Sequence, residues 1–136
     1  MSNRSEHSEA RVAEYAAAYE RLIGFAPPKI RARLPLSEEL DPELLELQEA
    51  VRQKAMHGSV LDDKTAQLML WGILLGQVGQ GARWHGIAAR RCGASWEELH
   101  AVAALAYLFR GLPAMNLAAD IVNELREDDP LEGGGA

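Results

Sequence analysis

The sequence predicts an all-α protein of six or seven helices. Apolar residues recur every three or four positions through most of the 136 residues, which is the spacing of one buried helix face. Residues that favour helix starts, Asp41-Pro42 and Ser95 with Glu98, stand where new apolar stripes begin. No segment alternates apolar and polar residues with the period of two that marks a half-buried strand. Helices packed on helices are therefore the expected architecture.

The composition is that of an ordinary globular domain, and it argues against several classes of function. Hydrophobic residues make up 48% of the chain and charged residues 25%, with a formal net charge of −6. Such an acidic chain lacks the concentrated basic face that binds nucleic acid or an anionic membrane, so we expect neither partner. The longest apolar run, Leu68 to Leu75, is far shorter than the roughly 20 residues that span a bilayer.

Cysteine usage and the N-terminal residues indicate a cytoplasmic protein. Cys92 is the only cysteine, so no internal disulfide can form. The first ten residues contain no apolar segment of the kind found in secretory signals. A reducing compartment fits both observations.

The first half of the chain predicts two helices. Residues 1–7 are polar and should be disordered, and a helix should follow from Ser8 to Ile23. Gly24 and Pro27-Pro28 end that helix, because glycine favours a C-cap and proline cannot continue it. Lys29 to Leu34 should form only a short helical turn before Pro35.

The second predicted helix starts at Asp41-Pro42 and runs to His57, where Gly58 ends it. Its expected buried face consists of Leu44, Leu47, Val51 and Ala55.

The next predicted helix, Lys64 to Val78, is apolar on nearly every side, and Asp62 or Asp63 can cap it. Its apolar residues are Leu68, Met69, Leu70, Trp71, Ile73, Leu74 and Leu75. A helix without a polar face is buried all round, often because a partner subunit covers it. This helix therefore predicts a homo-oligomer.

Three further helices complete the expected fold. A glycine-rich turn leads to a short helix from Ala82 to Arg91, and a capping box at Ser95 opens the next one. The apolar residues that this helix carries are Leu99, Val102, Leu105, Ala106 and Phe109. Pro113 can start a last helix to about Arg126. A single domain over 8–126 and a disordered acidic and glycine-rich tail over 127–136 are expected.

Three stretches of the second half resemble one known family. They are LDDKTAQL at 61–68, RRCGASWEELHAV at 90–102 and YLFRGLPAMNLA at 107–118. With a glycine turn and a histidine-bearing helix between the first two, they are similar to the carboxymuconolactone decarboxylase family, which includes the alkylhydroperoxidase D-like proteins. The likeness covers about Tyr19 to Glu124.

This resemblance implies an all-helical fold that assembles as trimers or hexamers, with active sites near subunit boundaries. It also implies a role in the breakdown of aromatic compounds. The peroxidase-like branch of the family uses a CxxC pair whose second cysteine stands four residues before a histidine. Here those positions are Val78 and Gly81, before His85. Because no thiolate is available to attack a peroxide, a thiol peroxidase is excluded.

The decarboxylase branch lacks the two thiols and keeps the histidine, as this chain does. The glutamate that the peroxidase-like branch carries in the preceding helix falls at about Gln67. The residues just before the histidine, Ala82 to Trp84, depart from the usual decarboxylase pattern, and this departure leaves the substrate open.

His85 is the candidate catalytic residue. Its helix follows a glycine-rich turn, so the helix N-terminus would favour an anionic ligand. An imidazole with an ordinary pKa of about 6.5 exchanges protons near neutral pH. Removal of CO2 from a lactone acid requires a proton for the carbon left behind. The alternative is a core histidine whose ring is hydrogen-bonded to a backbone carbonyl.

The candidate substrate-binding residues are Arg83, Trp84, Arg110, Gln77 and Gln80. A guanidinium group binds a carboxylate through two parallel hydrogen bonds, a tryptophan can form an apolar wall, and a glutamine can donate to a ligand oxygen. The alternatives are surface ion pairs for the arginines, core packing for the tryptophan and turn solvation for the glutamines.

Neither a metal nor a cysteine–histidine pair is expected. Glu97 and His100 form one E-x-x-H pair, whereas a di-iron helical bundle needs two such pairs and two more glutamates. Cys92 and His85 lie seven residues apart on one helix, about 10.5 Å along its axis, which excludes direct contact. Cys92 is therefore expected to be a small core residue.

The sequence thus favours a cofactor-independent, homo-oligomeric decarboxylase of a small carboxylated lactone or related ring acid. His85 would be the acid/base, and Arg83 or Arg110 the carboxylate anchor. Two alternatives stay open: an isomerase or cyclase of another small metabolite on the same fold, and a non-catalytic small-molecule-binding protein that has lost the thiols.

Overall fold

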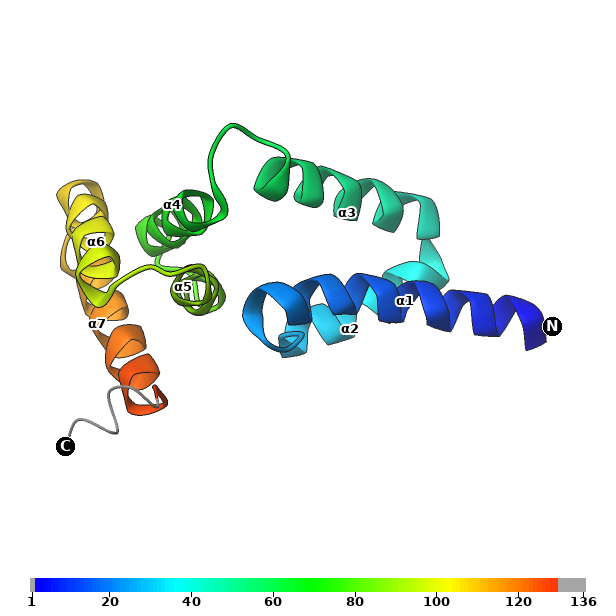
Figure 1. The fold of residues 1–136 in the computed structure, drawn as a ribbon. Helices are drawn as coiled ribbons and strands as arrows, with labels where there is room; N and C mark the ends of the chain where they lie inside the picture. The colour runs from blue at the N-terminus through cyan, green and yellow to red at the C-terminus, as the bar shows by residue number, and fades with distance from the viewer. Residues whose placement is uncertain (1, 130–136) are drawn as a thin grey trace. The chain divides into compact units, whose positions relative to one another are not determined.

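The computed structural model describes residues 2–129, and within that range it is all helical, as predicted (Figure 1). The seven helices are α1 (Ser2–Ile23), α2 (Pro28–Leu40), α3 (Pro42–His57), α4 (Asp63–Gly76), α5 (Ala82–Arg91), α6 (Trp96–Arg110) and α7 (Leu112–Glu127). None of the described helices is long and apolar enough to cross a membrane. Most of the predicted disordered tail, 127–136, lies outside the described residues.

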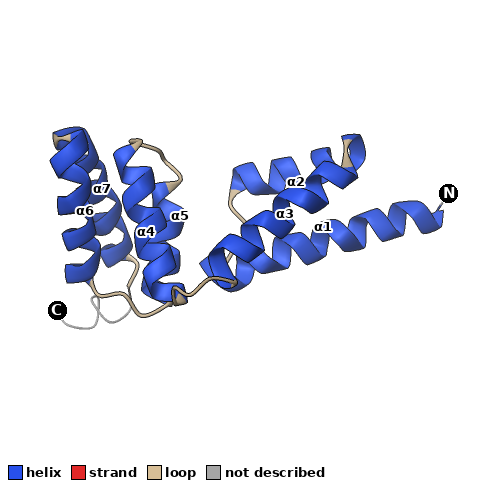
Figure 2. Ribbon diagram, turned by 90° about the horizontal axis from the view of Figure 1, so that it is seen from above, coloured by secondary structure: helices blue, strands red, loops and turns tan. Residues whose placement is uncertain are grey.

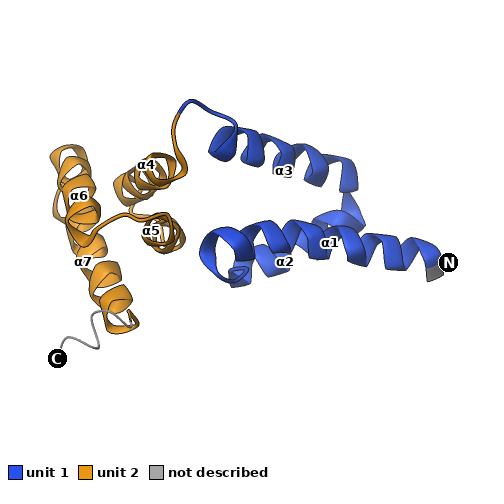
Figure 3. Cartoon of the chain, in the orientation of Figure 1, with its two compact units in different colours: residues 1–60 blue, residues 61–136 orange. Residues whose placement is uncertain are grey.

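The chain forms two compact units, where we expected one domain over 8–126. Unit 1 comprises residues 1–60 with α1 to α3, and unit 2 comprises residues 61–136 with α4 to α7 (Figure 3). Within unit 2, α4 packs against α5 and α6, and α7 packs against α6 (Figure 2). All candidate site residues belong to unit 2.

Unit 1 differs from the prediction at two helix boundaries. Helix α1 begins at Ser2, not at Ser8, so residues 2–7 are helical where disorder was expected. No glycine or proline interrupts them, and each added residue gains one backbone hydrogen bond once a helix exists. Helix α2 continues through Pro35 to Leu40. Its C-terminal part buries Glu38 against the rest of unit 1, and that packing outweighs the backbone hydrogen bond that Pro35 cannot make.

A buried polar cluster sets the orientation of α3. The Tyr19 hydroxyl donates to Glu49 Oε1 at 2.9 Å, and Arg33 Nη2 donates to the same oxygen at 2.7 Å. Burial raises the pKa of the Tyr19 phenol, so its hydroxyl keeps the proton that it donates. Because Glu49 must face α1 and α2, α3 buries Leu45 and Glu49.

The buried face predicted for α3 is therefore wrong, because α3 turns a different face toward α1 and α2. Leu44, Leu47 and Val51 are exposed, because each lies on another side of the helix from Leu45 and Glu49. The apolar residues have helical spacing, but the stripe that is buried contains the charged residue Glu49.

The core of unit 2 is built around Trp71 of α4, which is 0% exposed. The buried residues packed with it are Leu75, Ala82, Ala89, Ala94, Leu99, Ala103, Ala114, Ala118 and Ile121. The indole Nε1 donates to the backbone oxygen of Leu99 at 3.1 Å, which ties α4 to α6. Small residues on α5 to α7 let these helices close around one large ring.

Two apolar helix faces of unit 2 are only partly buried. Met69 and Ile73 of α4 are 52% and 53% exposed, although the helix was expected to be covered on every side. On α6, Leu99 is buried, but Leu105 and Phe109 are exposed, the latter to 98%. These apolar side chains are not covered by the other helices of unit 2.

Helix α4 ends in a Schellman motif with an unusual residue at its left-handed position. The Val78 amide donates to Leu75 O, and the Gly79 amide donates to Leu74 O, both at 2.9 Å. Val78 carries the positive φ of 51° that this motif requires. Helix α5 ends in the same motif, but with Gly93 at the equivalent position and a φ of 100°. A β-branched residue in this conformation is strained.

We expect the Val78→Gly substitution to stabilise the protein by about 1 kcal/mol. Relief of roughly 1–2 kcal/mol of left-handed strain is partly offset by roughly 0.4–1 kcal/mol of added chain entropy in the unfolded state. Urea denaturation would measure this change, with Gly93→Ala as the matched control of opposite sign. An unchanged or lower midpoint for Val78→Gly would mean that the strain is compensated by contacts of the valine side chain.

Candidate active site

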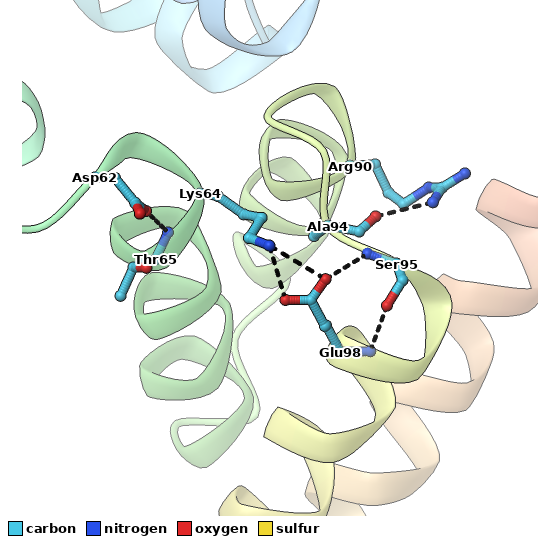
Figure 4. A network of polar contacts seen from close by, with 7 residues as sticks. All are labelled: Asp62, Lys64, Thr65, Arg90, Ala94, Ser95 and Glu98. Carbon is cyan, nitrogen blue, oxygen red and sulfur yellow. Dashed lines mark hydrogen bonds and ion pairs between the residues drawn. The ribbon is translucent and has the colours of Figure 1, made fainter.

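Side-chain caps set the starts of two helices of unit 2, α4 and α6 (Figure 4). Asp62 accepts from the Thr65 amide at 2.7 Å, so Asp62 is the cap of α4. At the start of α6, Ser95 Oγ accepts from the Glu98 amide at 3.0 Å and Glu98 Oε1 accepts from the Ser95 amide at 3.1 Å, which confirms the predicted capping box. Lys64 Nζ lies 3.1 Å from Glu98 Oε2 and joins the two helix starts.

These contacts favour the ionised carboxylates. The hydrogen bond from the Ser95 amide, followed by the Lys64 ammonium, lowers the pKa of Glu98. The hydrogen bond from the Thr65 amide lowers the pKa of Asp62. Both caps are therefore strongest when the carboxylates are charged.

Arg90 has a structural role at the end of α5. Its Nη1 donates to Ala94 O at 2.8 Å, and its Nη2 pairs with Asp129 at 2.6 Å (Figure 4 shows the first contact). The guanidinium also lies 3.8 Å from the centre of the Trp96 ring. One side chain thus joins α5, the start of α6 and the residues after α7.

His85 lies on the first turns of α5 and contacts α4 through a buried amide. Its Nδ1 is 2.8 Å from Oε1 of Gln67, which is 0% exposed. The amide oxygen of glutamine can only accept a hydrogen bond, so Nδ1 is the donor in this contact. The contact joins residues that are 18 positions apart in the sequence.

The backbone of α5 is held close to α4 next to this contact. A Cβ atom added to Gly86 would lie 3.0 Å from the Trp71 ring, closer than ordinary packing allows. Glycine at this position thus lets the indole pack directly on the α5 backbone, one residue after His85. The imidazole is positioned both by its own hydrogen bond and by the packing of its helix.

The predicted substrate-binding residues are not all gathered around His85. Arg83 forms an ion pair with Glu124 of α7, so its guanidinium group already binds a carboxylate. Arg110 is exposed at the last position of α6. Gln77 and Gln80 are exposed in the turn between α4 and α5, and Trp84 is half-buried on α5.

Gln67 is the site residue that sequence reasoning did not select for substrate or proton chemistry. The family resemblance places the glutamate of the peroxidase-like branch at about this position. The signal was present in the sequence, because Gln67 is a lone uncharged polar residue at the start of the apolar run from Leu68 to Leu75. A polar residue on a buried stripe must find a hydrogen-bond partner.

The other candidates for chemistry stand apart from this contact. Glu97 and His100 are both exposed on α6. Among residues 2–129, no group of three or more His, Cys, Asp and Glu side chains is arranged to hold a metal ion. Burial, followed by the negative charge of Asp63, raises the pKa of the Cys92 thiol, which disfavours the reactive thiolate.

The fold of this chain is similar to that of a protein of known crystal structure. Neither protein families nor curated proteins gave a match to this sequence. A crystal structure of a protein from Burkholderia xenovorans LB400, provisionally named a carboxymuconolactone decarboxylase, matches with a TM-score of 0.73 and 24% identity. The match covers 89% of this chain and 95% of that chain. The chain therefore has the all-helical fold of a carboxymuconolactone decarboxylase-like protein, as its resemblance to that family predicted.

Proposed function

We propose that the protein is a cofactor-independent decarboxylase of a small carboxylated lactone or related ring acid, and a member of the carboxymuconolactone decarboxylase family. The observation that carries this proposal is the 2.8 Å contact between His85 and the buried Gln67, on the fold of a protein bearing that name. An imidazole oriented by a second group is the arrangement expected of a general acid or base.

The proposed reaction is a proton-coupled loss of CO2. The bond between the ring carbon and its carboxylate breaks, CO2 leaves, and the electron pair stays on the ring carbon. The imidazolium of His85 then transfers a proton to that carbon. Solvent afterwards returns a proton to the imidazole of His85. No external oxidant or reductant is needed.

Substrate binding requires an anchor for the carboxylate. Arg110 is exposed and can take this role directly, whereas Arg83 would have to exchange its Glu124 partner for the substrate. Trp84 would form an apolar wall beside His85, and Gln77 and Gln80 would donate to the lactone oxygens.

The experiment that tests this proposal is product analysis with carboxymuconolactone and purified protein. Release of one CO2 per molecule of substrate consumed supports the decarboxylase. A product of unchanged mass would support the isomerase or cyclase, and substrate that binds but returns unchanged would support the non-catalytic binding protein. Val78 and Gly81 at the positions of the family's thiols motivate that last alternative.

The proposed enzyme is a cytoplasmic homo-oligomer, either a trimer or a hexamer. The exposed apolar residues of α4 and α6, among them Met69, Ile73 and Phe109, support this assembly because such side chains are normally covered. Light scattering should give a mass of at least three protomers. A mass near the 14.9 kDa of one chain would exclude the oligomer.

A further inference from the structure

We infer that Gln67 is a positioning residue that holds the neutral His85 ring in one tautomer, with its proton on Nδ1 and its basic lone pair on Nε2. This inference deepens the proposed function, because it names Nε2 as the atom that would exchange the proton with substrate. Only the exchange of a proton with substrate rests on the proposed function. The tautomer is a property of the protein alone.

The geometry of the contact specifies the tautomer. Gln67 Oε1 and His85 Nδ1 are 2.8 Å apart, an ordinary hydrogen-bond length. Because the oxygen has no proton to offer, the hydrogen must lie on Nδ1, and a neutral imidazole then carries no hydrogen on Nε2. The amide group thus does for this ring what a backbone carbonyl or a carboxylate does for many catalytic and metal-binding histidines.

The burial of Gln67 makes the arrangement rigid. Gln67, Trp71 and Leu75 are spaced four residues apart on α4, and all three are 0% exposed. The glutamine therefore lies on the same buried stripe as the core residue Trp71. A buried amide without a partner is costly, so the side chain is held where its oxygen is hydrogen-bonded.

The partner of His85 Nδ1 is a neutral amide, and this distinguishes the contact from one with a carboxylate at position 67. Two arginines of α5 pair with carboxylates: Arg83 with Glu124 of α7, and Arg90 with Asp129. On α4, Lys64 pairs with Glu98 at the helix start, where Asp63 also lies. A glutamate at position 67 would stabilise the imidazolium and raise the pKa of His85.

The test is a long-range proton–nitrogen NMR spectrum of the full-length protein labelled with ¹⁵N-histidine. The chain has four histidines, and the signals lost in His85→Gln identify the ring of interest. At a pH where this ring is neutral, we expect a protonated Nδ1 and an unprotonated Nε2. The Gln67→Met variant, which is similar in shape but offers no amide oxygen, should lose this Nδ1–H signature.

Three outcomes decide the inference. A ring protonated on Nε2 in the wild type would overturn it, and so would a Gln67→Met protein that keeps the Nδ1–H tautomer. An upward shift of the His85 titration in Gln67→Glu would support it. If either variant fails to fold by circular dichroism, the wild-type spectrum still decides the tautomer. No substrate enters these measurements, so a failed decarboxylation assay would leave this result standing.

Discussion

The His85→Gln variant should decarboxylate carboxymuconolactone at a rate roughly 10²–10⁴-fold below the wild type, the range ascribed to a single general acid or base. Glutamine retains a side chain that can hydrogen-bond to Gln67, but an amide cannot carry a proton to carbon. The loss should appear in kcat more than in KM, because proton transfer occurs in the transition state. Steady-state kinetics with release of CO2 as the readout measures both constants.

His100 offers a matched control for this substitution. It is exposed on α6, so His100→Gln makes the same chemical change away from the Gln67 contact and should keep the wild-type rate. Circular dichroism of both variants establishes that they are folded. A wild-type rate in the His85 variant would remove this residue from the mechanism, and the search for the proton donor would turn to other groups.

The largest loss of stability is expected for Trp71→Ala, at about 3–5 kcal/mol for a fully buried tryptophan. The substitution empties the centre of the unit 2 core and also leaves the Leu99 carbonyl without its indole donor. At roughly 0.05–0.15 kcal/mol of stability per residue, a loss of this size is comparable to the whole stability of a unit of this length. Urea denaturation followed by circular dichroism measures it.

Trp71→Phe separates the two contributions of the indole. This variant keeps most of the ring volume and removes the hydrogen bond to Leu99, so a smaller loss of about 1–3 kcal/mol is expected. Trp96→Ala, a half-buried tryptophan stacked on Arg90, should cost less than Trp71→Ala. Equal losses at positions 71 and 96 would contradict the central place of Trp71 in the core.

Local chemistry explains why so much of the fold was predictable. The Asp41-Pro42 start, the Ser95–Glu98 capping box and the short helix from Ala82 to Arg91 all occur as predicted. Each depends on hydrogen bonds or dihedral preferences within a few residues of the chain. Such features are encoded in short stretches, and the choice of an all-α fold follows from them.

The fold class and most of the helix starts and ends therefore follow from the sequence alone, which also selects His85 as the candidate catalytic residue. Which side chains meet depends on the packing of whole helices. The tertiary structure brings Gln67 to His85 across 18 residues, gives Arg83 the partner Glu124, and turns Leu45 and Glu49 of α3 inward. Helical periodicity tells which residues share a face, but the face that is buried depends on distant partners. That choice rests on the packing and hydrogen bonding of whole helices, and no local pattern records it.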